Sequence, residues 1–465
     1  MKLPGEGRVF TLVLAATAGT MLVSCSGPST YEAPQMALSD HYSITQPAQV
    51  NRRAGAAWWT AFEDTTLDAL IARALGQNLS IAEARARVRE SEALARRAGI
   101  QTADVSADVT LASTGGDTTG LNLAAIFSPG RRAEIKAARA RLDAERNAET
   151  NARRLVVGEL AQAYADLRYF QVLLTYRQQD LRSRQRTLND IRAQFDVQEA
   201  TRLDVVRAEA LLAQTRAEIP QVEAEVYILR SRIATLLGEA PGVAGLHFDA
   251  SGGQLVPRGG SKIGVPADLL RARPDVRQAE REYAAAVSDL SVAKAARYPS
   301  LSLAGLIQAP LEGGASAESL ELGFNLPIFT QPALAANVSA AEARVDLALI
   351  GWKKTVVSAV DEVESALLAL AAGQRSVSAS ADVVRLNQEA LDLSRRLFLD
   401  GGQSTVLEVL DRERALSESR ASLAKAQRNV AQDYIRLYTA LGLEDGLGAA
   451  DGGKLAEVSP APVTE

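Results

Sequence analysis

The chain has 465 residues, a formal net charge of −5, one cysteine and two histidines. A single cysteine excludes a disulfide framework, and His41 and His247 lie far apart and away from any acidic cluster. A structural zinc site and most nucleophile–histidine mechanisms therefore lack residues, and the acidic balance gives no general attraction to nucleic acid. We expect no enzyme activity, no cofactor and no bound metal.

The first residues have the pattern of a secretory signal. Lys2 and Arg8 precede a largely apolar run over residues 9–23. This run is shorter than the ~20 residues that a membrane-spanning helix needs. The pattern therefore predicts a signal peptide over residues 1–24.

The end of this signal, Leu22-Val23-Ser24-Cys25, resembles a bacterial lipobox. The resemblance implies that Cys25 is acylated and starts the mature chain, and that Ser26, standing where an inner-membrane lipoprotein has Asp, directs it to the outer membrane. An ordinary cleavable signal with a chance cysteine is the alternative. Residues 25–56 contain several Pro, Ser and Gln residues, lack periodicity and are predicted to be a lipidated tether.

Apolar residues recur at helical spacing from Leu67, and this pattern predicts one helix as far as Ala98. Longer patterns predict helices over about 131–194 and 333–398, and the first would be roughly 95 Å long at ~1.5 Å per residue. Return helices are expected over about 201–238 and 404–442. Spaced Leu and Val among Ala, Arg, Glu and Gln are typical of coiled-coil packing, so a plain antiparallel coiled coil is one interpretation.

Four short segments, in pairs at about 104–127 and about 300–329, alternate apolar and polar residues at period two. The alternation continues as far as Ile328, and its charges, Asp108 and Glu321, fall on the polar phase. This pattern is typical of transmembrane β-strands with one lipid-facing side, although a soluble half-buried sheet also alternates. Four strands cannot close a barrel, and lipid does not tolerate open sheet edges, so a membrane sheet requires oligomerisation.

The chain matches itself. Leu121 to Pro129 corresponds to Phe324 to Pro332, and Phe195 to Glu209 corresponds to Leu399 to Glu413 at an offset of 204 residues. In both copies of the first block, a strand pair leads into a long helix. Such self-similarity indicates one duplicated architecture.

Several blocks resemble the outer-membrane factor lipoproteins of tripartite efflux systems, the OprM/NodT-like members of the TolC superfamily. The blocks are Trp58-Trp59 with Phe62 and Asp64; Val265-Pro266-Ala267-Asp268-Leu269-Leu270 with Arg273-Pro274-Asp275-Val276; Tyr298-Pro299-Ser300-Leu301; and Asn325-Leu326-Pro327-Ile328-Phe329. The resemblance covers about residues 25–445.

The resemblance implies a mainly α fold with a small transmembrane β part, closing as a homotrimer with a 12-strand barrel and a 12-helix tunnel. Two outer-membrane-factor repeats, 57–250 and 266–445, would be joined by an equatorial segment over 251–265 and followed by a flexible tail over 446–465. The implied partners are a periplasmic adaptor protein, an inner-membrane pump and outer-membrane lipid.

The implied function is a passive exit duct for small organic or amphiphilic compounds across the periplasm and the outer membrane. A soft-metal path would favour Met or His, and only Met36 of three methionines remains after processing. The alternatives are a lipid-anchored coiled-coil scaffold without a pore and the exit duct of a type I protein secretion system.

The resemblance also places Glu408 and Asp411 at the periplasmic aperture and Asp204 in a polar network at the same tip. The two acidic residues are three apart and share a helix face, although a solvated face next to Arg412 and Arg414 is the alternative. The chain departs from the family pattern at Gln198, where a glycine is usual. It also departs at Ser404 and Thr405, where a basic residue is usual. Pro220 predicts a kink in a return helix.

Overall fold

The computed structural model describes residues 31–36, 57–100, 104–113, 117–242, 253–258, 273–310, 317–399 and 404–442. The predicted signal peptide, Cys25, both histidines, Gly401-Gly402 and the C-terminal tail lie outside these residues. So does most of the segment predicted to be equatorial.

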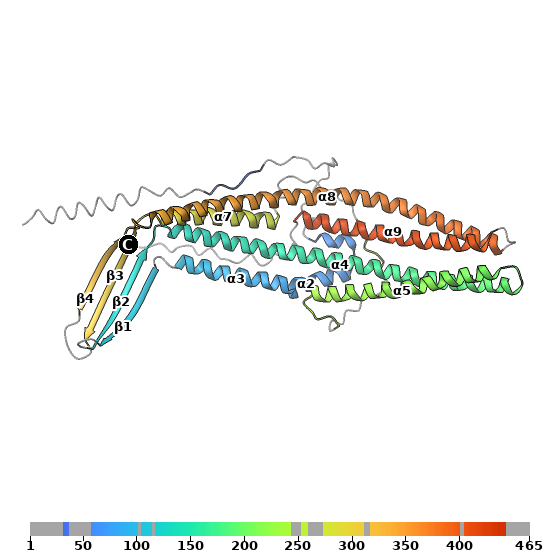
Figure 1. The fold of residues 1–465 in the computed structure, drawn as a ribbon, viewed down its shortest axis with the longest axis horizontal. Coiled ribbons are helices and arrows are strands. Elements are labelled where there is room, and N and C mark those ends of the chain that lie inside the picture. Colours follow the sequence, from blue (N-terminus) through green and yellow to red (C-terminus); the bar gives the residue numbers. More distant parts are fainter. Residues whose placement is uncertain are drawn as a thin grey trace, which may run out of the picture. The chain divides into compact units, whose positions relative to one another are not determined.

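Two similar series of elements follow each other along the chain (Figure 1). After a 3-10 helix, η2 (Trp58–Phe62), and α2 (Thr65–Gln77), the first series is α3 (Leu79–Ile100), β1 (Asp104–Ser113), β2 (Asp117–Phe127), α4 (Arg131–Asp196) and α5 (Arg202–Leu236). The second is α7 (Pro274–Ala295), β3 (Ser300–Pro310), β4 (Ala317–Asn325), α8 (Gln331–Leu399) and α9 (Val406–Ala440). The predicted duplication and the mainly helical fold with one small sheet are confirmed.

The chain forms two compact units. The first comprises Met1–Ala37, Ala86–Asn147 and Asp275–Thr355, and it contains the four-stranded sheet. The second comprises Leu38–Arg85, Ala148–Pro274 and Val356–Glu465, and it contains the largest apolar core. Both α4 and α8 contribute residues to each unit.

The helix predicted from Leu67 to Ala98 is divided at Asn78, so the prediction of one continuous helix is wrong. The side chain of Asn78 accepts hydrogen bonds from the backbone N–H groups of Ser80 (2.9 Å) and Ile81 (3.1 Å), which makes it the N-cap of α3. Its amide nitrogen also donates to the carbonyl of Leu236 (2.7 Å), at the end of α5. A tertiary hydrogen bond therefore holds this residue outside the helix.

Both return helices end in the same way, 204 residues apart. Gly238 (φ 78°) follows α5 and Gly442 (φ 68°) follows α9, and a Cβ at either position would lie 2.6 Å or less from the chain. Arg273 of the Arg-Pro-Asp-Val block is buried and donates to the carbonyl of Ala440 (2.7 Å), much as Asn78 serves α5. Each repeat thus satisfies a terminal carbonyl that its helix leaves unpaired.

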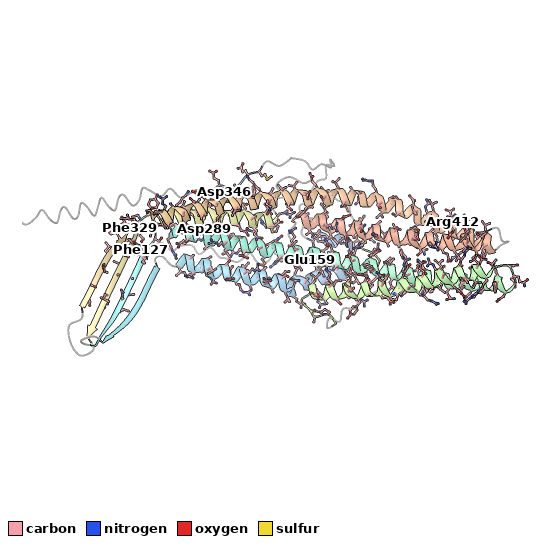
Figure 2. The ribbon with its side chains drawn as sticks, in the orientation of Figure 1. Phe127, Glu159, Asp289, Phe329, Asp346 and Arg412 are labelled. Carbon is pink, nitrogen blue, oxygen red and sulfur yellow. The ribbon has the colours of Figure 1, made fainter. Side chains whose placement is uncertain are left out.

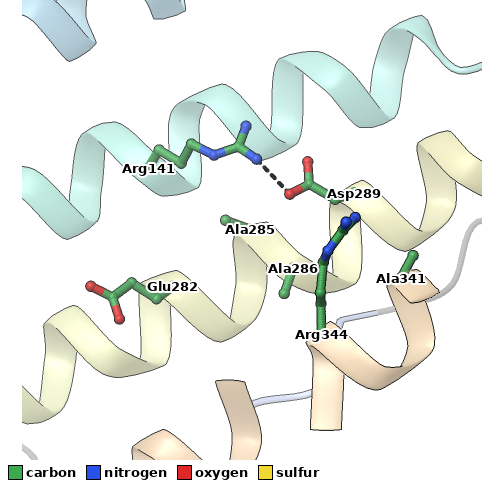
Figure 3. Close-up of a pocket in the computed structure, with 7 residues that line it drawn as sticks. All are labelled: Arg141, Glu282, Ala285, Ala286, Asp289, Ala341 and Arg344. Carbon is green, nitrogen blue, oxygen red and sulfur yellow. Dashed lines mark hydrogen bonds and ion pairs between the residues drawn. The ribbon is translucent and has the colours of Figure 1, made fainter. Parts of the chain in front are cut away.

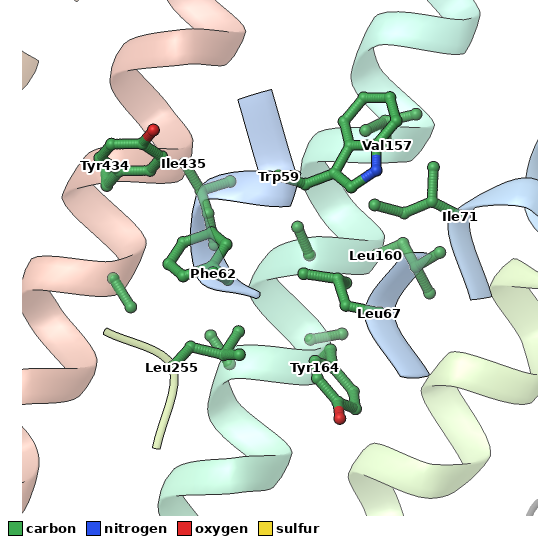
Figure 4. Packing of buried hydrophobic residues seen from close by; sticks show 14 of the residues in the cluster. Trp59, Phe62, Leu67, Ile71, Val157, Leu160, Tyr164, Leu255, Tyr434 and Ile435 are labelled. Atoms are coloured by element: carbon green, nitrogen blue, oxygen red, sulfur yellow. The ribbon is translucent and has the colours of Figure 1, made fainter. Parts of the chain in front are cut away.

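The Trp-Trp block forms the centre of the larger unit. Trp58, Trp59 and Phe62 are buried, and Phe62 packs edge-on against Tyr434 of α9 (Figure 4). Asp64 caps α2 and accepts a hydrogen bond from the hydroxyl of Tyr164 of α4 (3.0 Å). These residues join the N-terminal helices to α4 and α9, which accounts for the spacing of the block.

A buried polar cluster, which we call the Glu413 cluster, joins α4, α8 and α9 in the same unit. One carboxylate oxygen of Glu413 accepts hydrogen bonds from Thr187 of α4 (2.7 Å) and from Arg395 of α8 (2.5 Å). Arg395 also donates to Ser183 of α4 (2.7 Å). The side chain of Glu413 is 4% exposed, so its charge depends on these partners rather than on water.

Replacing Glu413 by Ala should therefore destabilise the fold strongly. The substitution leaves Arg395 without its carboxylate in a largely dry site, and breaking a buried pair typically costs about 3–5 kcal/mol. The matched control is Glu418→Ala on the exposed side of the same helix, expected to change stability by less than about 0.5 kcal/mol. Thermal melting of the helical circular dichroism signal compares the two variants, and equal melting temperatures would contradict a role for the cluster in stability.

Candidate functional site

The sheet is antiparallel throughout, with the order β1-β2-β3-β4, and its register brings the apolar phases of the strands to one face. Directly paired residues share a face. Three rows across β2, β3 and β4 define the apolar face: Phe127, Leu301 and Phe324; Ala125, Leu303 and Leu322; Leu123, Gly305 and Leu320. The leucines and Phe324 at β4 are 56–78% exposed, so nothing in this chain covers them.

The opposite face is more polar. Its rows are Asn122, Leu306 and Ser319; Ala124, Ala304 and Glu321; Ile126, Ser302 and Gly323. A Cβ on Gly323 would lie 2.6 Å from the hydroxyl of Ser302, so a glycine fits this close row. One face is therefore suited to lipid and the other to water, as the alternation predicts.

Two details of the strand prediction are wrong. The register pairs Glu318 with Ile307, so one charge lies on the apolar face, one residue from the start of β4. A charge is tolerated there because the hairpin end of a membrane strand lies near the headgroups, where the cost falls to ~0–1 kcal/mol. The strand also ends at Asn325 rather than continuing to Ile328, because Pro327 has no N–H for the ladder.

Aromatic side chains lie where the sheet passes into helices. Phe127 ends β2 and Phe329 precedes α8, and Figure 2 shows both at this junction. They are 43% and 97% exposed, and Tyr298, before β3, is 43% exposed. Exposed aromatic residues at this level are typical of the boundary between hydrocarbon and water.

The other end of α4 forms a tight turn around Gln198. This residue adopts a left-handed conformation (φ 66°) that usually favours glycine. Its N–H donates to Phe195 O (3.0 Å), and the N–H of Glu199 donates to Gln194 O (2.8 Å), which together make a Schellman motif. Gln198 thus takes the role of the missing glycine at a conformational cost of ~1–2 kcal/mol.

The predicted tip residues Asp204 and Glu408 occupy equivalent places in two capping boxes. Asp204 bonds the backbone N–H (3.0 Å) and hydroxyl (2.6 Å) of Thr201, and the hydroxyl bond contributes most to lowering the pKa of Asp204. Glu408 accepts from the N–H of Thr405 (3.0 Å) and the hydroxyl of Ser404 (2.8 Å), and these bonds lower its pKa in that order. Each carboxylate therefore stays charged and fixed at the start of its helix.

Asp411 lies one turn beyond Glu408 on α9 and is exposed, with Arg414 at 3.9 Å. The structure thus places Glu408 and Asp411 together on α9, as predicted. The contacts described for Asp204 lie within its own turn and with Arg207 (3.9 Å), so its place in an inter-helix network stays a prediction. The Glu413 cluster was not foreseen, although a carboxylate between Leu410 and Leu416, at a core-facing spacing, is a readable signal.

A hollow of about 190 Å³ lies between α4, α7 and α8 in the unit that contains the sheet (Figure 3). Arg141 and Asp289 form an ion pair across it (2.5 Å), and alanines line its floor. Its lining carries both signs of charge and favours no single ligand. Within the described residues there is no cluster of His, Cys, Asp or Glu able to hold a metal, and no helix there is long and apolar enough to cross a membrane.

Comparison with known proteins identifies relatives over nearly the whole chain. Nodulation protein T of Rhizobium leguminosarum bv. viciae is 33% identical over 446 residues, covering 92% of each chain. The pyoverdine export outer membrane protein OpmQ of Pseudomonas putida is 28% identical, covering 90% of this chain and 95% of its own. The cation efflux system protein CusC of Escherichia coli (strain K12) is 27% identical, covering 90% and 96%.

Solved structures agree with the fold. The outer-membrane channel OprN superposes with a TM-score of 0.79 at 25% identity, covering 91% of this chain and all of that one. The open state of the MtrE outer membrane channel of Neisseria gonorrhoeae has the same fold, with a TM-score of 0.78 at 22% identity and coverage of 90% and 99%.

The family described as "Outer membrane efflux protein" matches residues 70–239 and 265–443, one segment in each repeat. The resemblance drawn from the sequence blocks is thereby confirmed, together with the outer-membrane location. The chain belongs to the outer membrane efflux protein family, and it is an outer-membrane efflux channel of the kind that serves tripartite pumps.

Proposed function

We propose that three copies of this chain form one exit duct, with four strands from each copy in a 12-strand barrel and α4, α5, α8 and α9 of each in a 12-helix tunnel. The observation that carries this proposal is the amphipathic sheet with two open edges, β1 and β4. In an order of four antiparallel strands these edges run in opposite directions. The β4 of one copy can therefore pair antiparallel with the β1 of the next until the ring closes.

In this duct the polar sheet face lines a water-filled lumen, and the two repeats, 57–250 and 266–445, each contribute one strand pair and two tunnel helices. An adaptor protein and an inner-membrane pump supply energy and select the cargo. Small organic or amphiphilic compounds are the proposed cargo class. The printed names of the relatives include a siderophore exporter and a cation exporter, which supports a duct whose own chemistry is not tied to one substrate.

The lipid-facing role of the apolar face is testable with single arginines. Leu322→Arg should reduce assembled trimer strongly, because a basic residue on a lipid-facing strand costs ~2–4 kcal/mol near the middle of the bilayer. Asn325→Arg, on the other face of the same strand, is the control and should assemble nearly as wild type. The measurement is the yield of heat-modifiable trimer in outer membranes; a monomeric wild type, or equal effects of the two variants, contradicts the proposal.

We also propose that Cys25 carries the acyl anchor. The lipobox motivates this, and two or three acyl chains make a stable tether because each buried methylene adds about 0.8 kcal/mol. Mass spectrometry of the mature N-terminus should find diacylated Cys25. Cys25→Ala should lose this modification but retain some trimer, since the barrel has its own membrane affinity. A mature N-terminus at another residue would contradict the anchor.

At the tip, we propose that Glu408 and Asp411 of the three chains form the narrowest ring of the duct. Both are exposed on α9 at its first turns, and the cap hydrogen bonds hold Glu408 charged. Fixed carboxylates in a confined pore raise the local cation concentration. Asp204, the equivalent cap residue of α5, is proposed to help hold the tip closed, so its substitution should raise conductance without abolishing selectivity.

The ring is best tested by removing charge while keeping the caps. Glu408→Gln with Asp411→Asn retains a capping-box side chain and should weaken both cation selectivity and block by divalent cations in planar bilayers. Trimer yield should not change. Glu418→Gln, two turns further along α9 and exposed, is the control. If the double variant keeps wild-type selectivity and block, the carboxylates are only a solvated helix face.

A further inference from the structure

Helix α5 has two apolar stripes on opposite sides. One stripe is buried against the rest of its unit and includes Val205, Ala208, Leu212, Val222, Val226 and Leu229. The other is exposed and repeats with the alternating three- and four-residue spacing of a coiled coil: Leu203, Val206, Ala210, Ala213, Ala217, Pro220, Ala224 and Tyr227. Leu203 and Val205 are two residues apart and thus about 200° apart around the helix. We call the exposed stripe the α5 seam.

Helix α8 has a matching exposed stripe, the α8 seam. Its members are Val383, Leu386, Ala390, Leu393 and Leu397, again at three- and four-residue spacing. The four large side chains are 45–54% exposed, and this face receives no cover from the described part of the chain. The α5 seam is mostly Ala, whereas the α8 seam is mostly Leu, so their volumes complement each other.

These two helices are the outer helices of their unit. Arg216 of α5 donates to Gln185 of α4 (3.2 Å), Arg428 of α9 pairs with Asp166 of α4 (2.6 Å), and Arg420 of α9 donates to Gln388 of α8 (2.6 Å). The order is therefore α5, α4, α9, α8, as Figure 1 also shows. A helix in a single-layer wall needs an apolar stripe toward each neighbour, and one neighbour of α5 and of α8 is missing from this chain.

We infer that the α5 seam of one copy packs against the α8 seam of the next copy, an inference that rests on the proposed trimer and names the surface that closes its tunnel. The occupant is a second copy because the sheet edges call for the same head-to-tail neighbour, with one outer strand and one outer helix on each side. A heterologous pairing of two different surfaces closes into a ring, as a trimer requires.

Contacts within the chain set the register of this interface. Glu413 binds both Thr187 of α4 and Arg395 of α8, so these residues lie at one level. Arg184, one turn earlier on α4, donates to the hydroxyl of Thr215 and to the carbonyl of Leu211 of α5 (3.3 Å). Because rotation about the tunnel axis preserves height, Ala213 of one copy is level with Leu393 of its neighbour.

This register gives Pro220 a place. It lies seven residues beyond Ala213, one heptad along the α5 seam, and so faces Leu386 of the neighbouring copy. The described α5 is continuous through Pro220, which is exposed on this seam. A proline here keeps a small, rigid surface in a row of alanines.

The same register brings opposite charges together beside the seams. Arg216 of α5 becomes level with Glu389 of the neighbouring α8. Glu209 of α5 becomes level with Arg396. Flanking pairs of this kind set the partner and direction of a coiled-coil contact more than its strength.

Disulfide cross-linking tests both the surface and its register. The only native cysteine is Cys25, and the Cys25→Ala background removes it. In that background Ala213→Cys with Leu393→Cys should give covalent dimers and trimers under mild oxidation, seen on denaturing gels without reductant. Ala224→Cys with Leu393→Cys is the control, because the extra 11 residues add about 16 Å along the helix and exceed the reach of a disulfide.

Each result is decisive when native mass is measured in parallel. Covalent trimer from the first pair, with at least tenfold less from the control, is expected. A trimer by mass that cross-links only through the control pair, or through neither pair, overturns the seam assignment and leaves the trimer standing. A chain that is monomeric by mass in the uncross-linked Cys25→Ala background overturns the proposed function itself.

Discussion

A sheet that lies in lipid must pair every backbone group, and the remaining features of this protein follow from that constraint. The chain supplies four strands with an apolar face and leaves β1 and β4 open. Closure therefore has to come from other copies. A ring of copies in turn needs helices that meet their neighbours on both sides, and this explains why α5 carries apolar stripes on two opposite sides.

The interfaces within one chain and the proposed interfaces between chains differ in chemistry. Within the chain, α4, α8 and α9 are joined by the buried Glu413 cluster, and α4 and α9 by further polar contacts such as Asp166 with Arg428. The exposed seams are apolar and largely alanine and leucine. Breaking a buried ion pair is costly, whereas smooth apolar stripes shift at smaller cost. We therefore expect each chain to move as one body when the tip opens, with rearrangement mainly at the seams between copies.

Duplication also explains where the functional carboxylates stand. Asp204 and Glu408 are the equivalent residues of two capping boxes, so their first role is to start α5 and α9. The cap holds each carboxylate charged at the end of its helix, where a pore-lining group is useful. The charge of the proposed ring is thus a consequence of helix capping, to which Asp411 adds a second, freely exposed carboxylate.

The amino-acid sequence by itself determined the long helices, the two repeats and the alternation of the strands, because periodicities of 3.6 and 2 are local properties of the chain. The predicted helix over 131–194 is observed as Arg131–Asp196 for this reason. Only the tertiary structure decided the division at Asn78, the left-handed Gln198, the face of Glu318 and the partners of Glu413. Each depends on a hydrogen bond or a register between segments, many of them distant in sequence, and spacing along the chain carries no record of such contacts.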